Sequence, residues 1–130
     1  MATPITEGRT LGDWLKWEED NLFSREKITL LGGDSEDLAL ITGTVLGKLT
    51  SGGKYVALTE GPSDGSQTPA AILIYDTAVP DGVDTEASAI VRDAIVNWDC
   101  VLWPTTYDAA NKTAAIAVLK ALGIVLREGA

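Results

Sequence analysis

The sequence predicts a mainly β domain that carries one C-terminal helix, an α+β arrangement. Two observations predict it. Short apolar runs separated by turn-forming residues fill most of the chain from residue 28 onward, and one alanine-rich stretch near the C-terminus has the pattern of a helix. With 130 residues, 45% hydrophobic and 22% charged, the chain has the composition of a single globular domain.

The first 27 residues mix large aromatics with charges and are predicted to form an N-terminal arm (1–27) ahead of a β-rich domain (28–130). Thr10 to Asp13 resemble a capping box, and apolar residues after it fall on one helical stripe, so a marginal helix is expected over residues 11–20. The alternative is an ordinary amphipathic helix packed on its own domain. The arm residues expected to contact a partner are Leu11, Trp14, Leu15, Trp17 and Leu22.

Strands are predicted wherever short apolar runs lie between turn residues. Residues 51–53, Ser-Gly-Gly, are typical of a hairpin turn because glycine accepts positive φ at little cost. Residues 70–75 are apolar throughout and predict a strand buried on both faces, and residues 76–84 predict a turn region. The full set of expected strand runs is 28–31, 38–41, 42–50, 54–58, 70–75, 87–96 and 124–127.

The helix is predicted over residues 109–122. Asp108 is a suitable N-cap, the stretch is rich in alanine, and Gly123 stands where a helix-ending glycine is common.

Charge and residue types exclude several classes of function. A net charge of −9 argues against nucleic acid as a partner, because duplex binding depends on Lys and Arg at the phosphates. The sequence has no histidine, which excludes Ser-His-Asp and Cys-His catalysis and His-containing zinc sites. The single cysteine, Cys100, is expected to be a buried thiol. Residues 81–86 hold three carboxylates but lack the spacing of a calcium loop. We therefore expect no catalytic residue, no metal site and no cofactor.

The N-terminal residues lack a signal peptide pattern, and no apolar run reaches the length of a membrane-spanning helix. We therefore expect synthesis and residence in a reducing, cytoplasm-like compartment, with no membrane partner.

Four tryptophans are many for a small β domain, and large aromatics are enriched at the centres of protein interfaces. Each could instead pack in the core. Outside the arm, the residues expected at an interface are Trp98, Trp103 and Pro104.

An ordered set of motifs resembles the lambda-type head decoration proteins, the capsid-stabilising proteins of tailed bacteriophages. The resemblance extends over about residues 23–126. The motifs are Gly-Thr-Val-Leu-Gly-Lys at 43–48, Gly-Lys-Tyr at 53–55, Asp-Gly at 64–65, Ala-x-Ile-Leu-x-Tyr-Asp at 70–76, Val-Leu-Trp-Pro at 101–104 and Leu-Lys-Ala-Leu-Gly-Ile-Val at 119–125.

The resemblance implies a β-clip-like fold with an N-terminal arm and a homotrimer bound at local threefold sites outside the expanded phage head. There it would contact the major capsid protein and stabilise the shell against DNA pressure. The protein would be made in the host cytoplasm and reside on the virion's outer surface. The arm would add a strand to capsid-protein segments. An alternative is a stand-alone soluble β-domain that binds a small ligand or carbohydrate through Trp98 and Trp103. An enzyme that uses only carboxylates is a third interpretation.

Overall fold

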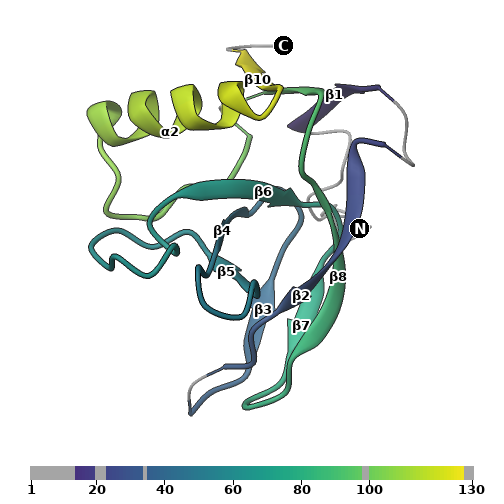
Figure 1. Ribbon diagram of the computed structural model, residues 1–130, viewed down its shortest axis with the longest axis vertical. Coiled ribbons are helices and arrows are strands. Elements are labelled where there is room, and N and C mark those ends of the chain that lie inside the picture. The colour runs from purple at the N-terminus through teal and green to yellow at the C-terminus, as the bar shows by residue number, and fades with distance from the viewer. Residues whose placement is uncertain (1–13, 20–22, 34, 98–99, 128–130) are drawn as a thin grey trace, which may run out of the picture.

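The computed structural model describes residues 14–19, 23–33, 35–97 and 100–127 (Figure 1). Strands dominate these residues, and one long helix lies near the C-terminus, which confirms the predicted fold class. The elements are β1 (Leu15–Glu18), β2 (Arg25–Leu30), β3 (Leu38–Leu40), β4 (Val45–Lys48), β5 (Tyr55–Ala57), β6 (Pro69–Leu73), β7 (Thr77–Val79), β8 (Thr85–Ile90), β9 (Ala94–Asn97), α2 (Ala109–Ala121) and β10 (Ile124–Arg127).

The centre of the fold is a closed barrel in the order β2-β5-β4-β6-β8. A three-stranded sheet, β1-β9-β10, lies beyond one end of the barrel, and β3 pairs with β7 in a small two-stranded sheet. Along the long axis of the molecule, β1, β10 and α2 lie together at one end, and the β7–β8 connection lies at the other (Figure 1).

The predicted hairpin between β4 and β5 is confirmed. The two strands pair antiparallel from Lys48 opposite Tyr55 to Leu46 opposite Ala57. Gly52 adopts a φ of 87° in the turn that joins them, a conformation that costs glycine little and other residues more.

The predicted burial of the 70–75 segment on both faces is confirmed for residues 71–74, which are at most 1% exposed, but Ala70 is half-buried and Tyr75 is 55% exposed. Because side chains alternate along a strand, β6 contributes to two separate hydrophobic clusters. Ile72 and Ile74 join a cluster with residues of α2, β9 and β10, whereas Ala71 and Leu73 join a second cluster with residues of β2 and β8. β6 therefore connects the barrel to the end that carries the helix.

The predicted ends of the helix are confirmed. Asp108 accepts a hydrogen bond from the Asn111 backbone N–H, and the Asn111 side chain accepts one from the Asp108 N–H, which completes a capping box. Gly123 follows the helix with a φ of 88°, and a Cβ placed there would lie 2.2 Å from Asp93 Oδ1. This position therefore requires glycine for both its backbone conformation and its space.

Three secondary-structure predictions are wrong. Of the helix expected over residues 11–20, the part from Leu15 to Glu18 is a strand, because pairing with β9 satisfies the backbone of this segment; Trp14 is helical, and residues 11–13 and 20 lie outside the described residues. The 76–84 turn region contains β7, which is stabilised by pairing with β3. The 87–96 run is two strands, because the chain turns between them at Asp93, whose φ is 44°. The expected arm boundary at residue 27 falls inside β2.

Candidate functional site

Trp14 is a core residue in the structure and not an exposed contact residue of an arm. Its side chain is fully buried, and its indole Nε1–H donates to Thr42 Oγ1 at 2.8 Å. The Thr42 hydroxyl in turn donates to the backbone oxygen of Ile74. A buried indole with a satisfied N–H is a stable arrangement, and it corrects the expectation that charged neighbours would keep Trp14 at a surface.

The other residues expected to contact a partner differ in their exposure. Leu15 is half-buried and packs against the same cluster as Trp14. Trp17 is 47% exposed, so it remains available to a partner. Leu11 and Leu22 lie outside the described residues.

Trp17 belongs to the outer face of the β1-β9-β10 sheet. It pairs with Ile95, which also pairs with Val125, so these three apolar side chains form a row across the sheet. Asn97 and Arg127 form the next row on the same face. We call these five residues the outer sheet face. The opposite face, with Ala94, Val96 and Ile124, is buried in the core.

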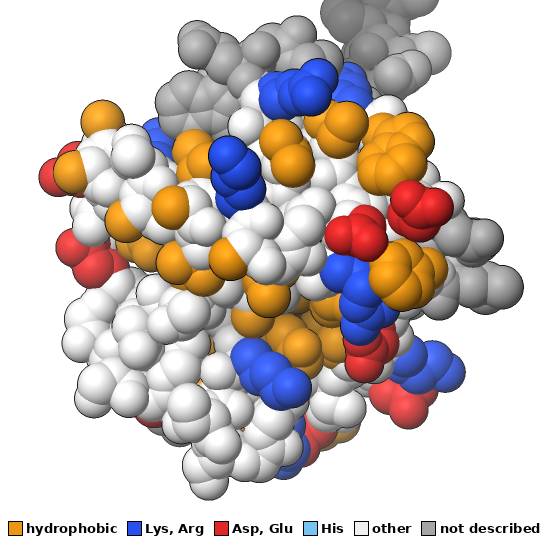
Figure 2. Space-filling view, turned by 45° about the horizontal axis from the view of Figure 1, so that its top comes forward, with side chains coloured by type: hydrophobic (Ala, Val, Ile, Leu, Met, Phe, Trp, Pro, Cys, Tyr) orange, Lys and Arg blue, Asp and Glu red, His pale blue; other side chains and the backbone are white. Residues whose placement is uncertain are grey.

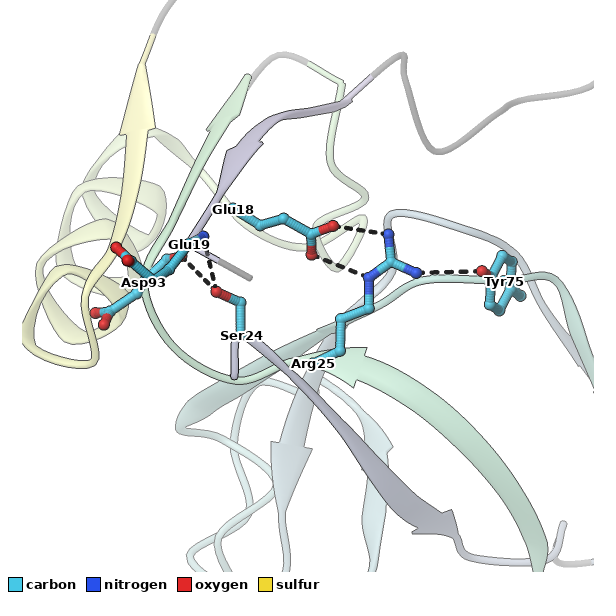
Figure 3. A network of polar contacts seen from close by, with 6 residues as sticks. All are labelled: Glu18, Glu19, Ser24, Arg25, Tyr75 and Asp93. Carbon is cyan, nitrogen blue, oxygen red and sulfur yellow. Dashed lines mark hydrogen bonds and ion pairs between the residues drawn. The ribbon is translucent and has the colours of Figure 1, made fainter. Parts of the chain in front are cut away.

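A polar network holds β1 against the start of β2 (Figure 3). Arg25 donates from Nε and Nη2 to both carboxylate oxygens of Glu18 at 2.9 Å, and from Nη1 to Tyr75 Oη at 3.2 Å. The hydrogen bond to Glu18 is the main reason that the Arg25 pKa lies above its ordinary value, and partial burial opposes this rise. The two-pronged pairing fixes the geometry of both side chains.

The connection between β1 and β2 is attached to the turn between β8 and β9. The Ser24 side chain is fully buried, accepts a hydrogen bond from the Glu19 N–H at 3.1 Å and donates to the Asp93 backbone oxygen at 2.8 Å (Figure 3). No local pattern predicts either part of this network, because its members meet only through the fold. The result is a β1 strand held firmly on the domain.

Trp103 and Pro104 are half-buried. The Trp103 ring stacks on Tyr107 with 6.1 Å between ring centroids and 16° between planes, and it also packs against the core. Part of the Trp103 side chain therefore packs in the core, and part of it remains exposed at the surface. Trp98, the third expected interface residue, lies outside the described residues.

Two hollows meet at Trp103 and Pro104. One, of about 220 Å³, is lined mostly by apolar residues and lies against β5 and the 39–45 segment; its lining includes Leu40, Ile41 and Leu58. The other, of about 370 Å³, extends to Tyr107 and Lys112. Burial raises the pKa of the Tyr107 phenol, with a smaller contribution from Glu60. This hollowed surface, mostly apolar in the smaller hollow and mixed in the larger one, can accept another protein's side chains.

The described residues contain no group of three Cys, Asp or Glu side chains that could hold a metal ion. In the 81–86 segment, Asp84 pairs with Lys54 at 2.5 Å and accepts a hydrogen bond from the Gly32 N–H.

Cys100 is half-buried and not fully buried as expected, and its sulfur accepts a hydrogen bond from Asn97 at 3.4 Å. Within the part of the chain that is described, no helix has both the length and the apolar character needed to cross a bilayer.

Comparison with known proteins identifies the chain. The model of the family described as bacteriophage lambda head decoration protein D matches residues 4–124. A search of curated proteins finds no match. The family match covers most of the chain and confirms the resemblance seen in the ordered motifs. The family's members are structural virion proteins and not enzymes. The chain therefore belongs to the bacteriophage lambda head decoration protein D family and has a structural role on the phage capsid.

Proposed function

We propose that this protein binds as a homotrimer to local threefold sites on the outside of the expanded phage head and stabilises the shell against DNA pressure. The observation that carries the proposal is the family match over residues 4–124. Binding to the expanded shell and not to other states would stabilise it by mass action. Three copies that act together would also turn a weak single contact into strong attachment.

The open edge of the β1-β9-β10 sheet supports a capsid contact through the N-terminal segment. β1 is the edge strand of this sheet, so its outer backbone groups have no strand partner among the described residues. An unpaired edge is a template for strand addition. We propose that residues 1–13 form the capsid-binding arm, with Trp14 as its attachment to the core and Trp17 beside the contact.

The hollowed surface at Trp103 and Pro104 supports contact between subunits. Each chain carries a net charge of −9, so three copies repel one another and need apolar contact to associate. The residues that line the smaller hollow are mostly apolar. We propose this surface as the trimer contact, with Trp98 beside it in sequence.

Co-sedimentation tests the proposal. Purified protein is mixed at micromolar concentration with expanded, undecorated heads of its own phage, and the pellet is assayed. We expect saturable binding, with three copies of the chain bound at each local threefold site. Unexpanded heads are the control and should bind much less. Protein that stays in the supernatant with expanded heads would contradict the proposal.

A truncation separates the arm from the domain. Deleting residues 1–13 should leave the far-ultraviolet circular dichroism spectrum and melting temperature close to wild type, because Trp14 and β1 remain. The same deletion should greatly weaken head binding. Full binding by the truncated protein would show that the arm is not the contact.

A further inference from the structure

Charge is distributed unevenly along the chain. Residues 109–130 contain three of the ten basic residues and one of the 19 acidic residues, Glu128. All other acidic residues precede the helix. In the fold this places the most basic part of an acidic protein on α2 and β10, at the end that also carries β1 (Figure 1). The far end, at the β2–β3 and β7–β8 connections, exposes Glu36, Asp37 and Asp81.

Two basic residues at the helix end, Lys120 and Arg127, lack the ion pairs that several other described basic residues form. Arg25, Lys27, Lys54 and Arg92 each pair with a carboxylate of this chain. Among the described residues, neither Lys120 nor Arg127 forms an ion pair, and both are exposed. Their charge is therefore available to another molecule.

These cations adjoin exposed apolar side chains. Arg127 lies on the outer sheet face, beside the row of Trp17, Ile95 and Val125. Leu122, 40% exposed, follows α2 two residues after Lys120. Figure 2 shows this end of the molecule: hydrophobic and basic side chains gather over it, and acidic side chains lie beside the large hydrophobic groups at the right of the view. Glu19 is an exposed acidic residue at its margin.

We propose that the outer sheet face, together with Lys120 and Leu122, docks on an acidic, partly apolar surface of the phage shell. The inference rests on the proposed function and adds the chemistry of the shell surface that is contacted. Charge complementarity points to an acidic partner, because the cations here are unpaired. Continuity points to the shell, since this face belongs to the same sheet whose β1 edge is proposed to receive a capsid strand. The acidic far end would then point away from the shell.

The test is the salt dependence of head binding. Wild type, the charge-reversed double variant Lys120→Glu/Arg127→Glu and a control, Lys27→Glu, are co-sedimented with expanded heads between about 0.02 and about 0.5 M NaCl. Lys27 is a suitable control because it is exposed on the barrel strand β2, where its ion pair with Glu86 is 3.7 Å long and solvated. Thermal melts establish that each variant is folded. The neutral variant Lys120→Gln/Arg127→Gln replaces the reversed one if that does not fold.

The expected result is an apparent dissociation constant that rises with salt for wild type and for the control. The double variant should bind about tenfold more weakly at low salt, and the difference should shrink at high salt as charges are screened. Equal binding of the double variant and the control at every salt concentration would overturn the inference while the proposed function stands. Light scattering tests whether a second copy of the chain, and not the shell, binds this face. A double variant that loses self-association would show that the face contacts a second copy, and this result would also overturn the inference. Wild type that fails to bind at any salt concentration would overturn the proposed function as well.

Discussion

Replacing Trp14 should destabilise the protein far more than replacing Trp17, three residues away. Trp14 is 0% exposed and Trp17 is 47% exposed. Truncating a buried tryptophan to alanine costs about 3–5 kcal/mol, because the lost burial is compounded by the cavity that remains. A domain of this size is stable by about 5–15 kcal/mol, so Trp14→Ala removes a large share. Trp17→Ala should cost about 1 kcal/mol or less.

Thermal unfolding followed by circular dichroism measures the difference. At about 4 °C per kcal/mol, Trp14→Ala should lower the melting temperature by about 10–20 °C and Trp17→Ala by about 4 °C or less. Thr42→Val provides a second measurement, because it leaves the buried Trp14 Nε1–H without its acceptor at 2.8 Å and should cost about 1–3 kcal/mol. Equal, small shifts for both tryptophan variants would refute the placement of Trp14 in the core.

Two further predictions concern a turn and an ion pair. Gly123→Ala should lower the free energy of unfolding in urea by about 2 kcal/mol. The alanine would have to adopt a positive φ, and its Cβ would lie 2.2 Å from Asp93 Oδ1. Gly52→Ala, with a similar φ but nothing within 4 Å, should cost only about 1 kcal/mol, and equal losses would contradict the steric argument. The Asp84 carboxyl has a lowered pKa, chiefly because Lys54 donates to it, so its contribution to stability exists above the unfolded pKa of about 3.9 and is lost as pH falls through the lower folded value. Asp84→Asn should therefore be less stable than wild type at pH 7, and the difference should shrink as the pH falls below the unfolded pKa of about 3.9, so a difference that stays undiminished in acid would contradict this.

The parts of the fold that depend on local sequence were predictable. The helix ends follow from Asp108 and Gly123, whose side chain and backbone freedom act within one turn of the helix. The β4–β5 hairpin follows from its glycine pair, and the burial of β6 follows from an uninterrupted apolar run. In each case the determining interaction lies within a few residues of the signal.

The parts that depend on distant partners were not predictable. β1 is a strand because it pairs with β9, almost 80 residues later, and the local helical stripe gave no indication of that partner. Trp14 is buried because the fold brings Thr42 to its indole nitrogen, although charged neighbours in sequence suggested a surface. The same limit applies to the candidate site, since the row of Trp17, Ile95 and Val125 exists only once three separate segments pair.

The heat stability of DNA-filled heads shows directly whether this protein stabilises the shell. Heads of the protein's own phage are packaged with full-length genome, and one preparation carries the protein while the other lacks it. Both preparations are heated with and without a chelator, and DNA release is followed with an intercalating dye. Heads without the protein should release DNA at a clearly lower temperature, and adding the protein back should restore the higher temperature. Identical release curves for the two preparations would show that the protein does not stabilise the shell.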